Sequence, residues 1–304
     1  RMGEEAILPL AMFRNKTVGV ASIASVLIGV AMFGGLAALP LYLQIVKGAT
    51  PTEAGLLLLP MTLGIMIGSI LSGQIISRTG RYRVFPIVGS ALLTISLFIF
   101  HYVASDTPLW QTMIVMTMFG VGLGFNFQPL TLAVQNAVPP QQIGVATSTA
   151  TFTRQIGGTL GTAVFLSILF STASEKITTA LAAAVPTQEC QAALADPANA
   201  AGAEQFAAAQ SGGGAATSVL SDSSFLTGLD ERLAKPFLIG FSEAMDLVFL
   251  TGSAVMVLGF LVMLMLPNVE LRKSASYGQR ENDGAPSDAD AANDVDDAAV
   301  IAHP

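Results

Sequence analysis

Cysteine, histidine and charged residues are scarce in this sequence. Its 304 residues include one cysteine, Cys190, two histidines, His101 and His303, and only 12% charged residues. A single cysteine cannot form a disulfide within the chain, and one cysteine with two histidines provides too few ligands for a zinc cluster. We therefore expect neither a disulfide scaffold nor a metal site, and the cysteine content leaves the redox compartment open.

Motifs for nucleotide binding, covalent catalysis and nucleic-acid recognition are missing as well. The sequence has no G-x-x-x-x-G-K-[S/T] loop, which excludes ATP binding by that device. No nucleophile–base arrangement stands out. The basic residues are few and lie at the margins of apolar segments, which is not the pattern of a nucleic-acid surface. We expect no enzyme activity, no cofactor and no nucleic-acid partner.

Hydrophobic residues, in contrast, make up 52% of the chain, and the mean hydropathy is +0.62. This composition is too apolar for a soluble globular protein. Six stretches are long and apolar enough to cross a bilayer. They are Val18–Val46, Ala54–Ile76, Val84–Val103, Leu109–Val134, Gly144–Phe170 and Phe237–Leu266. The sequence therefore predicts an all-α integral membrane protein with six transmembrane helices.

These spans divide the chain into five regions. We expect a cytoplasmic linker (1–17), a five-helix membrane region (18–170), an extracytoplasmic loop (171–236), a last membrane helix (237–267) and an acidic, disordered cytoplasmic tail (268–304). Within the long loop, Glu175–Val185 and Gln205–Gln210 are compatible with helix, whereas Gly212–Gly214 is a break. Because the chain begins inside what reads as a linker, we expect a fragment whose upstream membrane segments are missing.

Basic residues near the ends of the spans predict the orientation. One side of the membrane would carry Arg14, Lys16, Arg78, Arg81, Arg83, Arg272, Lys273 and Arg280. The other side has only Lys47 outside the long loop, whose charges the rule discounts. Both ends of the chain are therefore expected in the cytoplasm. The net charge of −7 does not alter this, since seven of the 21 acidic residues lie in the tail between Glu281 and Asp297.

Arg154 lies about ten residues inside the fifth span. At a rise of about 1.5 Å per residue it would be roughly 15 Å from the helix end, near the bilayer midplane. A charge there costs at least about 3 kcal/mol on insertion scales, so it rarely occurs without a partner or a water-filled cavity. This position predicts a transport pathway rather than a simple membrane anchor.

Two spans carry a small and polar face at helical spacing. The face of the fifth span consists of Thr147, Thr151, Arg154, Gly158 and Gly161, and that of the fourth consists of Gly120, Gly124, Gln128, Thr131 and Gln135, beside Asn126 and Pro129. To the transport pathway we assign Arg154, Gln128, Asn126, Thr151 and Gln155. For Gln128 and Asn126, packing remains an equal alternative. Small residues also let membrane helices approach closely, and this role is favoured for Gly120, Gly124, Gly157, Gly158 and Gly161.

The last span begins with two acids, Glu243 and Asp246, one helical turn apart. They are candidates for carrying a coupled proton. However, Leu247–Leu266 is long enough to cross the bilayer without them, which favours a position for both acids at the outer interface. Arg154 then has no obvious carboxylate partner in this sequence, and we expect one in the missing segments.

The loop between the second and third spans has the sequence GQIISRTGRYR, from Gly73 to Arg83. Gly80 permits a tight turn, and Arg78, Arg81 and Arg83 offer donors to helix C-termini and to carboxylates on a neighbouring bundle. Taken alone, a positively charged membrane anchor explains these residues equally well.

This loop resembles the G-x-x-x-[D/S]-R-x-G-R-[K/R] signature of the major facilitator superfamily, although Tyr82 stands where a basic residue is usual and Arg83 follows one place later. Val138–Ser148 and Thr153–Gly161 look like the penultimate helix of the fourteen-helix drug:proton antiporters of that superfamily, and Leu8–Asn15 resembles the linker that enters their ninth helix. The resemblance covers nearly all of Leu8–Pro267. It implies that the chain is helices nine to fourteen, the C-terminal half of a transporter bundle.

The resemblance also implies a function, namely proton-coupled export of amphipathic, often cationic compounds by alternating access, in a bacterial inner membrane. The implied partners are a small-molecule substrate, protons, the lipid bilayer and the missing N-terminal half. Gly73, Arg78, Gly80, Arg81 and Arg83 would form a conformational-switch loop. The coupling signatures of the family belong to the N-terminal half. The alternatives are a lipid or siderophore exporter and a non-transporting scaffold or sensor.

Overall fold

The computed structural model describes residues 15–103, 105–196, 199, 202–204, 206–207 and 229–267. All of them belong to one compact unit, Arg1–Val269. The predicted acidic tail, most of the predicted linker, the glycine break at 212–214 and most of the helix expected at 205–210 lie outside the described residues.

The described residues form helices and no strand, which confirms the all-α prediction. In chain order the elements are α1 (Lys16–Ile45), α2 (Pro51–Leu57), α3 (Leu59–Thr79), α4 (Val84–Phe100), α5 (Leu109–Asn136), the short 3₁₀ helix η2 (Pro140–Gln142), α6 (Ile143–Ala184), α7 (Gln188–Ala195) and α11 (Glu231–Leu264). Five segments are long and apolar enough to span a membrane: α1, α2 with α3, α5, η2 with α6, and α11. The remaining predicted span is the shorter apolar helix α4.

Local sequence explains where several helices begin and end. The Asn15 side chain accepts a hydrogen bond from the backbone N–H of Thr17 at 2.9 Å and so caps α1. Thr50 and Glu53 form a capping box at the start of α2. Gly80 ends α3 in the left-handed conformation with φ of 70°, which glycine adopts without steric cost.

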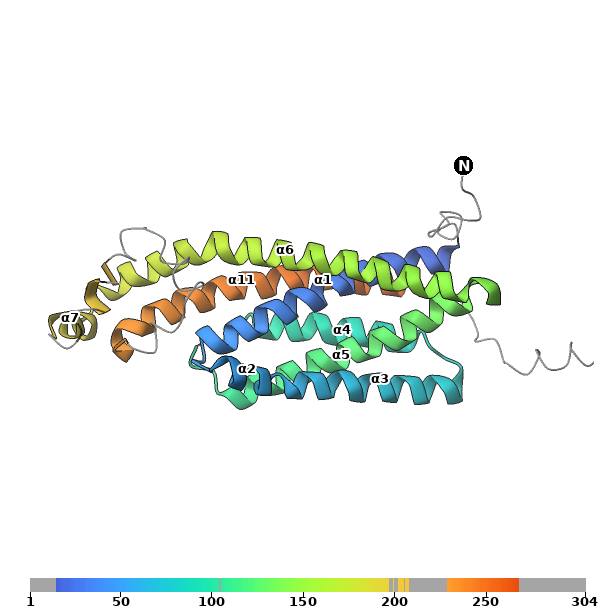
Figure 1. Cartoon of the computed structure of the whole chain (residues 1–304), viewed down its shortest axis with the longest axis horizontal. Helices are drawn as coiled ribbons and strands as arrows, with labels where there is room; N and C mark the ends of the chain where they lie inside the picture. The colour runs from blue at the N-terminus through green and yellow to red at the C-terminus, as the bar shows by residue number, and fades with distance from the viewer. Residues whose placement is uncertain are drawn as a thin grey trace, which may run out of the picture. The chain divides into compact units, whose positions relative to one another are not determined.

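Helix α6 is longer than the predicted span. It continues past Phe170 to Ala184, and its 42 residues extend about 63 Å, roughly twice the thickness of a bilayer core. Neither glycine nor proline interrupts the segment 171–184, and Pro186 follows its end. The helix expected at Glu175–Val185 is therefore a continuation of α6. Figure 1 shows α6 and α11 running beside each other towards α7, and α11 begins at Glu231 rather than at Phe237.

Glycines bring α6 against α1. A Cβ atom at Gly157 or Gly161 would overlap the backbone of Val26 or Val30, and one at Gly158 would overlap the Phe33 ring. The two helices are therefore as close as their backbones allow, which maximises van der Waals contact in an apolar environment. This interface fixes the rotation of α6 and hence the direction of its polar residues.

A second glycine interface joins α5 to α3, the pair at the lower edge of Figure 1. Gly120 faces the carbonyl oxygen of Met61, and Gly124 faces the backbone of Ile65 and Gly68. Small residues thus lie on both sides of this interface, and they bury one flank of α5. Gln128, one turn beyond Gly124 on the same side of α5, is exposed.

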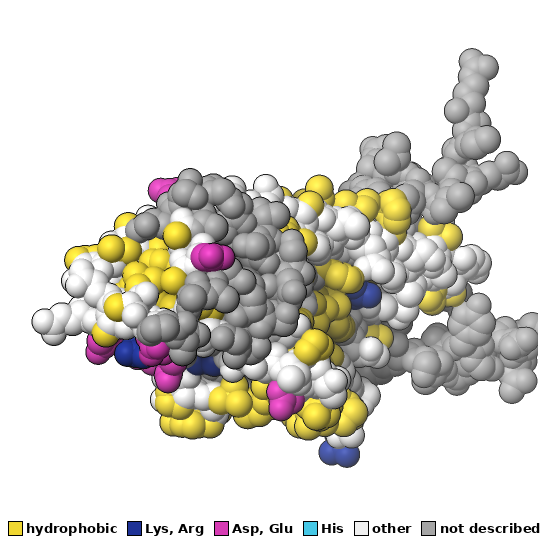
Figure 2. Space-filling view, turned by 60° about the vertical axis from the view of Figure 1, so that its left-hand side comes forward, with side chains coloured by type: hydrophobic (Ala, Val, Ile, Leu, Met, Phe, Trp, Pro, Cys, Tyr) yellow, Lys and Arg dark blue, Asp and Glu magenta, His cyan; other side chains and the backbone are white. Residues whose placement is uncertain are grey.

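The outside of the helical unit is strongly hydrophobic. Exposed apolar side chains on α3 include Leu59, Leu63, Met66, Ile67, Ile70 and Leu71. Such side chains form broad yellow patches on the face drawn in Figure 2. Apolar patches of this extent mark surfaces that are covered by lipid or by another protein element.

Candidate transport site

Arg154 belongs to α6, and its side chain contacts α5. Its backbone carbonyl faces Gly29, which is near the middle of α1. Its side chain is half-buried, and its Cζ atom lies 4.9 Å from the centre of the Phe127 ring on α5. The negative face of the ring stabilises the guanidinium charge by an amount of about 0.5 to 2 kcal/mol. The structure thus pairs this cation with an aromatic ring.

The guanidinium of Arg154 has no other described partner. Among the residues that the structure describes, the ion pairs are Lys176–Glu243 and Arg232–Asp230, and no hydrogen bond leaves the Arg154 side chain. Arginine carries five N–H donors and remains charged in proteins. The described residues therefore leave this partly desolvated cation without an acceptor for its N–H groups.

The exposed surface of α6 divides into a polar and an apolar sector. The polar sector contains Ser148, Thr151, Gln155 and Thr159, and the apolar sector contains Phe152, Ile156, Leu160 and Val164. Arg154 and Thr147 border the polar sector, and both contact α5, the latter through a 2.9 Å hydrogen bond from Gln135. The polar sector therefore adjoins α5, while the apolar sector turns away from it.

Gln128 and Asn126 lie on different sides of α5. Gln128 is exposed, and no described residue bonds its amide. Asn126 is fully buried beside Gly89 of α4, where its Nδ2 donates to the Gly122 carbonyl at 2.7 Å and its Oδ1 has no hydrogen-bond partner in the described structure. Residues that are two positions apart on a helix point in directions that differ by roughly 200°. The structure therefore places Thr151 and Gln155 on the sector of α6 beside Arg154, and it separates Gln128 and Asn126 from each other on α5.

The loop after α3 is fastened to the end of α11. The Tyr82 hydroxyl donates to the Pro267 carbonyl at 3.1 Å, and Nη2 of Arg83 donates to the Leu264 carbonyl at 2.8 Å. The last carbonyls of a helix lack partners within it and carry partial negative charge, so a guanidinium is a favourable ligand for them. Arg83 thus meets a helix C-terminus, one of the roles expected of this loop.

The other members of the loop motif do not join this contact. Arg78 and Arg81 are exposed, and Gly73 has open space where a side chain would be. Gly80 provides the turn that directs Tyr82 and Arg83 towards α11. Arg78 and Arg81 remain available for a surface that the described residues do not include.

The two acids of α11 lie near charged groups from other helices. Glu243 forms an ion pair of 3.3 Å with Lys176 of α6, and both side chains are about half exposed. Asp246 is half-buried, and the Nδ1 atom of His101 lies 3.2 Å from its backbone carbonyl oxygen. An exposed ion pair contributes about 0 to 1 kcal/mol to stability, so the pair of Glu243 with Lys176 contributes little to the stability of the fold.

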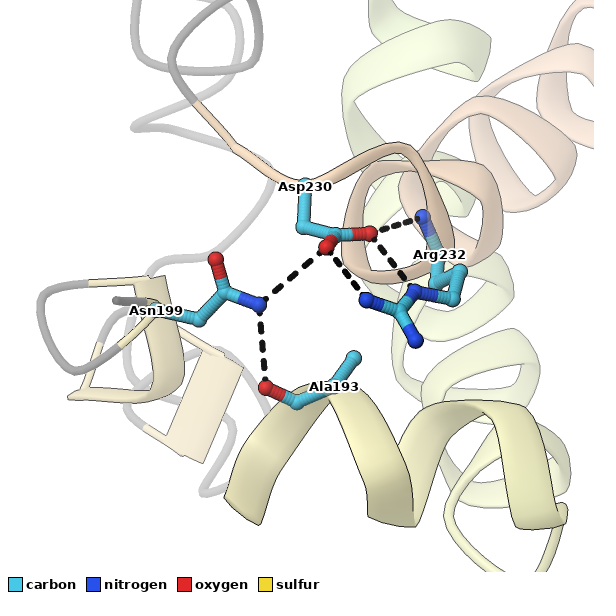
Figure 3. Close-up of polar contacts among 4 residues, drawn as sticks. All are labelled: Ala193, Asn199, Asp230 and Arg232. Carbon is cyan, nitrogen blue, oxygen red and sulfur yellow. Dashed lines mark hydrogen bonds and ion pairs between the residues drawn. The ribbon is translucent and has the colours of Figure 1, made fainter. Parts of the chain in front are cut away.

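A polar cluster joins α7 to the start of α11 (Figure 3). Asp230 caps α11 and accepts hydrogen bonds from Arg232 at 3.0 and 2.7 Å, while Asn199 bridges Asp230 and the carbonyl of Ala193. The hydrogen bonds from Arg232 hold the pKa of the Asp230 carboxyl well below its usual range.

Beside this cluster, α6, α7 and α11 enclose a pocket of about 370 Å³. Its walls include Ala183, Cys190, Lys235 and Glu243.

Two functional contacts had no clear signal in the sequence. Phe127 is an apolar residue between Asn126 and Gln128, and nothing in its spacing relates it to Arg154 on another helix. Tyr82 departs from the signature of the loop, yet it is the buried residue that reaches α11. Only the packing of α6 on α5, and of the loop on α11, reveals these partners. Among the described residues no group of histidine, cysteine and acidic side chains is arranged to hold a metal ion.

Comparison with known proteins agrees with a membrane bundle of this type. The sequence model of the Major Facilitator Superfamily matches residues 3–162. A tetracycline resistance determinant of Streptomyces rimosus is 35% identical over 273 residues, which cover 89% of this chain and 77% of that protein. An uncharacterized MFS-type transporter of Mycobacterium tuberculosis is 31% identical over 267 residues, which cover 88% of this chain and 34% of that protein.

A shorter match links the chain to the multidrug transporter protein MdtP of Bacillus subtilis, with 28% identity over 149 residues, or 49% of this chain and 27% of that protein. The chain thus spans about three quarters of the Streptomyces relative but only about one third of the Mycobacterium one.

Proposed function

This chain belongs to the Major Facilitator Superfamily, and we propose that it forms the C-terminal half of a fourteen-helix exporter of amphipathic small molecules. In this proposal the chain supplies helices nine to fourteen, and the N-terminal half completes the transporter. The relatives named for tetracycline resistance and for multidrug transport support drug-like substrates. The alignment with only one third of the Mycobacterium protein supports a longer parent.

The observation that carries the proposal is the polar sector of α6 beside α5 at mid-depth. Arg154, Gln128 and Gln155 have unused hydrogen-bonding groups there, in a unit whose other exposed faces are largely apolar. In lipid such groups would be costly, so a water-filled pathway between two transporter halves accounts for them best. Substrate sites of transporters with repeated helix bundles commonly lie near the midplane.

Alternating access would arise from rocking of this half against the N-terminal half. The contacts of Tyr82 and Arg83 with the end of α11 would hold the loop as one body with the bundle. Exposed Arg78 and Arg81 would then be free to bind carboxylates of the other half in one of the two states. This division of roles supports the loop as a conformational switch.

The transporter would lie in the bacterial cell membrane with both ends of this chain in the cytoplasm. The basic residues of the loop 78–83 and of the tail support that orientation. The extended ends of α6 and α11, with α7, would project on the outer side. Lipid would cover the apolar sector of α6 and the outer face of α3. Where the two halves of the transporter meet, the N-terminal half would cover these surfaces instead.

Proton coupling would come from carboxylates, and Glu243 and Asp246 are the candidates within this half. Asp246 is better placed, because it is half-buried close to His101, whereas Glu243 is paired with Lys176 near the surface. If Asp246 carries the coupled proton, Asp246→Asn will export substrate at a rate that no longer depends on the pH gradient. Export by Asp246→Asn that still follows the gradient would exclude Asp246 and leave coupling to Glu243 or to the N-terminal half.

The direct test is transport by the complete parent protein in everted membrane vesicles. Uptake of ethidium and of 8-anilinonaphthalene-1-sulfonate would be followed after a proton gradient is imposed, for the native protein and for Arg154→Ala at equal abundance. We expect uptake of at least one probe that an uncoupler abolishes and that Arg154→Ala lowers about tenfold or more. Lys235→Gln removes an exposed cation at the far end of α11 and serves as the matched control.

Each other outcome would favour a different site or a different function. Uncoupler-sensitive uptake that is indifferent to Arg154→Ala would keep the function and overturn the site. Uptake of neither probe, with lipid or iron-chelate transport instead, would favour a lipid or siderophore exporter. A variant that changes nothing except abundance, in a protein without any transport, would favour a scaffold or sensor.

A further inference from the structure

The charge at the proposed transport site has one sign. Arg154 is the charged residue in the middle of the described helices. The acidic residues of α6 and α11, which are Glu175, Glu231, Glu243 and Asp246, lie towards the outer ends of these two helices. No described carboxylate lies within ion-pair distance of Arg154. In a medium of low dielectric constant, an uncompensated positive charge attracts anions and repels cations over several ångströms.

The guanidinium of Arg154 contacts Phe127 and has unused N–H donors. The Cζ atom lies 4.9 Å from the centre of the ring, and this contact restricts the side chain. The N–H donors of a guanidinium lie in its plane and point outward from its edge. No described residue accepts a hydrogen bond from these donors. A planar anion with two oxygens matches such an edge with two parallel hydrogen bonds.

The surroundings of Arg154 suit the rest of such a ligand. Gln128 and Gln155 are exposed amides without hydrogen bonds to described residues, and each offers both donors and an acceptor. Phe127, which contacts the guanidinium, presents apolar surface at the same place. A ligand with an anionic head and an aromatic or aliphatic body would use both kinds of surface.

We propose that Arg154, held against Phe127 and flanked by Thr151 and Gln155, binds the anionic group of the transported amphiphile, so that the exporter selects acids over cations. This inference rests on the proposed function, because it concerns the same pathway. It names the substrate class as amphiphiles with a carboxylate, sulfonate or enolate. It also departs from the cationic substrates that the family resemblance implies.

The competing arrangement is a carboxylate of the N-terminal half that pairs with Arg154. The guanidinium would then be neutralised within the protein, and the site would not distinguish anions from cations. Removing Arg154 would leave that acid unpaired, which would strengthen the binding of cations. Both arrangements favour cations once Arg154 is removed. They differ for the anion, which the native protein binds through Arg154 in the proposed arrangement but not at a neutralised site.

The test measures binding and transport separately, with the complete parent transporter purified in detergent and reconstituted in liposomes. The anionic probe is 8-anilinonaphthalene-1-sulfonate, and the cationic probe is ethidium; both keep their charge at neutral pH. Dissociation constants are compared for the native protein, Arg154→Gln, Arg154→Lys and the control Lys235→Gln. We expect Arg154→Gln to weaken binding of the anion about tenfold or more and not to weaken binding of ethidium.

Arg154→Lys keeps the charge but loses the planar pair of donors, so we expect an intermediate loss for the anion. Equal losses for both probes, or no binding of the anion by the native protein, would each overturn the inference. The proposed function fails in another way, namely when reconstituted native protein moves neither probe in response to a proton gradient. Export of ethidium with no affinity for the anion would keep the function and reject the inference.

Discussion

The guanidinium of Arg154 on α6 lies over the ring of Phe127 on α5, with 4.9 Å between Cζ and the ring centre. This pair joins two helices whose mutual contact is otherwise small compared with their contacts to α1 and α3. It therefore couples the position of the midplane cation to the part of α5 that carries Gln128.

Replacement of Phe127 tests this coupling. Phe127→Leu removes the ring face but keeps a large apolar side chain, so we expect binding of the anionic probe to weaken about threefold to tenfold. The measurement is the dissociation constant in the purified transporter. Phe125→Leu is the matched control, since Phe125 packs edge-on against Phe85 of α4 and does not contact the arginine. In an Arg154→Gln background the effect of Phe127→Leu should vanish.

The glycine interface between α6 and α1 makes a second prediction. A Cβ atom at Gly157 would overlap the Val26 backbone, so Gly157→Ala should destabilise the protein by about 1 to 3 kcal/mol. Thermal unfolding in detergent, measured as a lower midpoint, checks this. Gly55→Ala on α2 is the control, because open space surrounds that position. An unchanged midpoint for Gly157→Ala would mean that the helices are less closely packed than described.

The hydrogen bond from Arg83 to the end of α11 leads to a third prediction. Arg83→Ala removes the donor to the Leu264 carbonyl and should free the last turn of α11, at a cost of about 1 to 2 kcal/mol. Hydrogen exchange of the backbone amides of Met265 and Leu266, which bond within that turn, should then accelerate. Arg81→Ala removes a neighbouring exposed arginine and should leave exchange unchanged. Equal acceleration in both variants would point to general loosening of the loop.

The cap of α11 makes a prediction about pH. The pKa of Asp230 in the folded protein lies below its ordinary value, chiefly because Arg232 donates hydrogen bonds to the carboxylate. A carboxyl of this kind contributes stability above its unfolded-state pKa, near 4, and loses that contribution as the pH falls through the depressed folded value. Hydrogen exchange at the start of α11 should accelerate as the pH decreases below about 4, after correction for the intrinsic rate. In Asp230→Asn this acceleration should be absent, and its persistence would assign it to another acid.

The membrane character and the helix order of this protein follow from the sequence alone. Runs of apolar residues of membrane length, separated by short polar links, allow little besides spanning helices, because backbone groups in lipid must bond within their own segment. The resemblance to the major facilitator superfamily also needed only sequence, and the family match over residues 3–162 confirms it. The assignment to the C-terminal half stays a prediction.

Sequence spacing placed residues along each helix but did not show which neighbour each residue faces. Glycines at helical spacing on α5 and α6 indicated close packing, and the structure places both sets against neighbouring backbones. In contrast, Asn126 was grouped with Gln128, yet they face different neighbours. Spacing along a helix gives the angle between two residues but not which angle is buried.

What the sequence determined by itself is therefore the class of the protein, the order of its helices and the presence of a cation within a long apolar segment. Only the tertiary structure showed that Arg154 contacts Phe127 and that Asn126 is buried. It also showed the contacts of Tyr82 and Arg83 with α11 and the extension of α6 alongside α11. The physical reason is that hydrophobicity and helical period are local properties. Rotation and register of one helix against another depend instead on close contacts, such as Gly157 with Val26, between residues far apart in the chain.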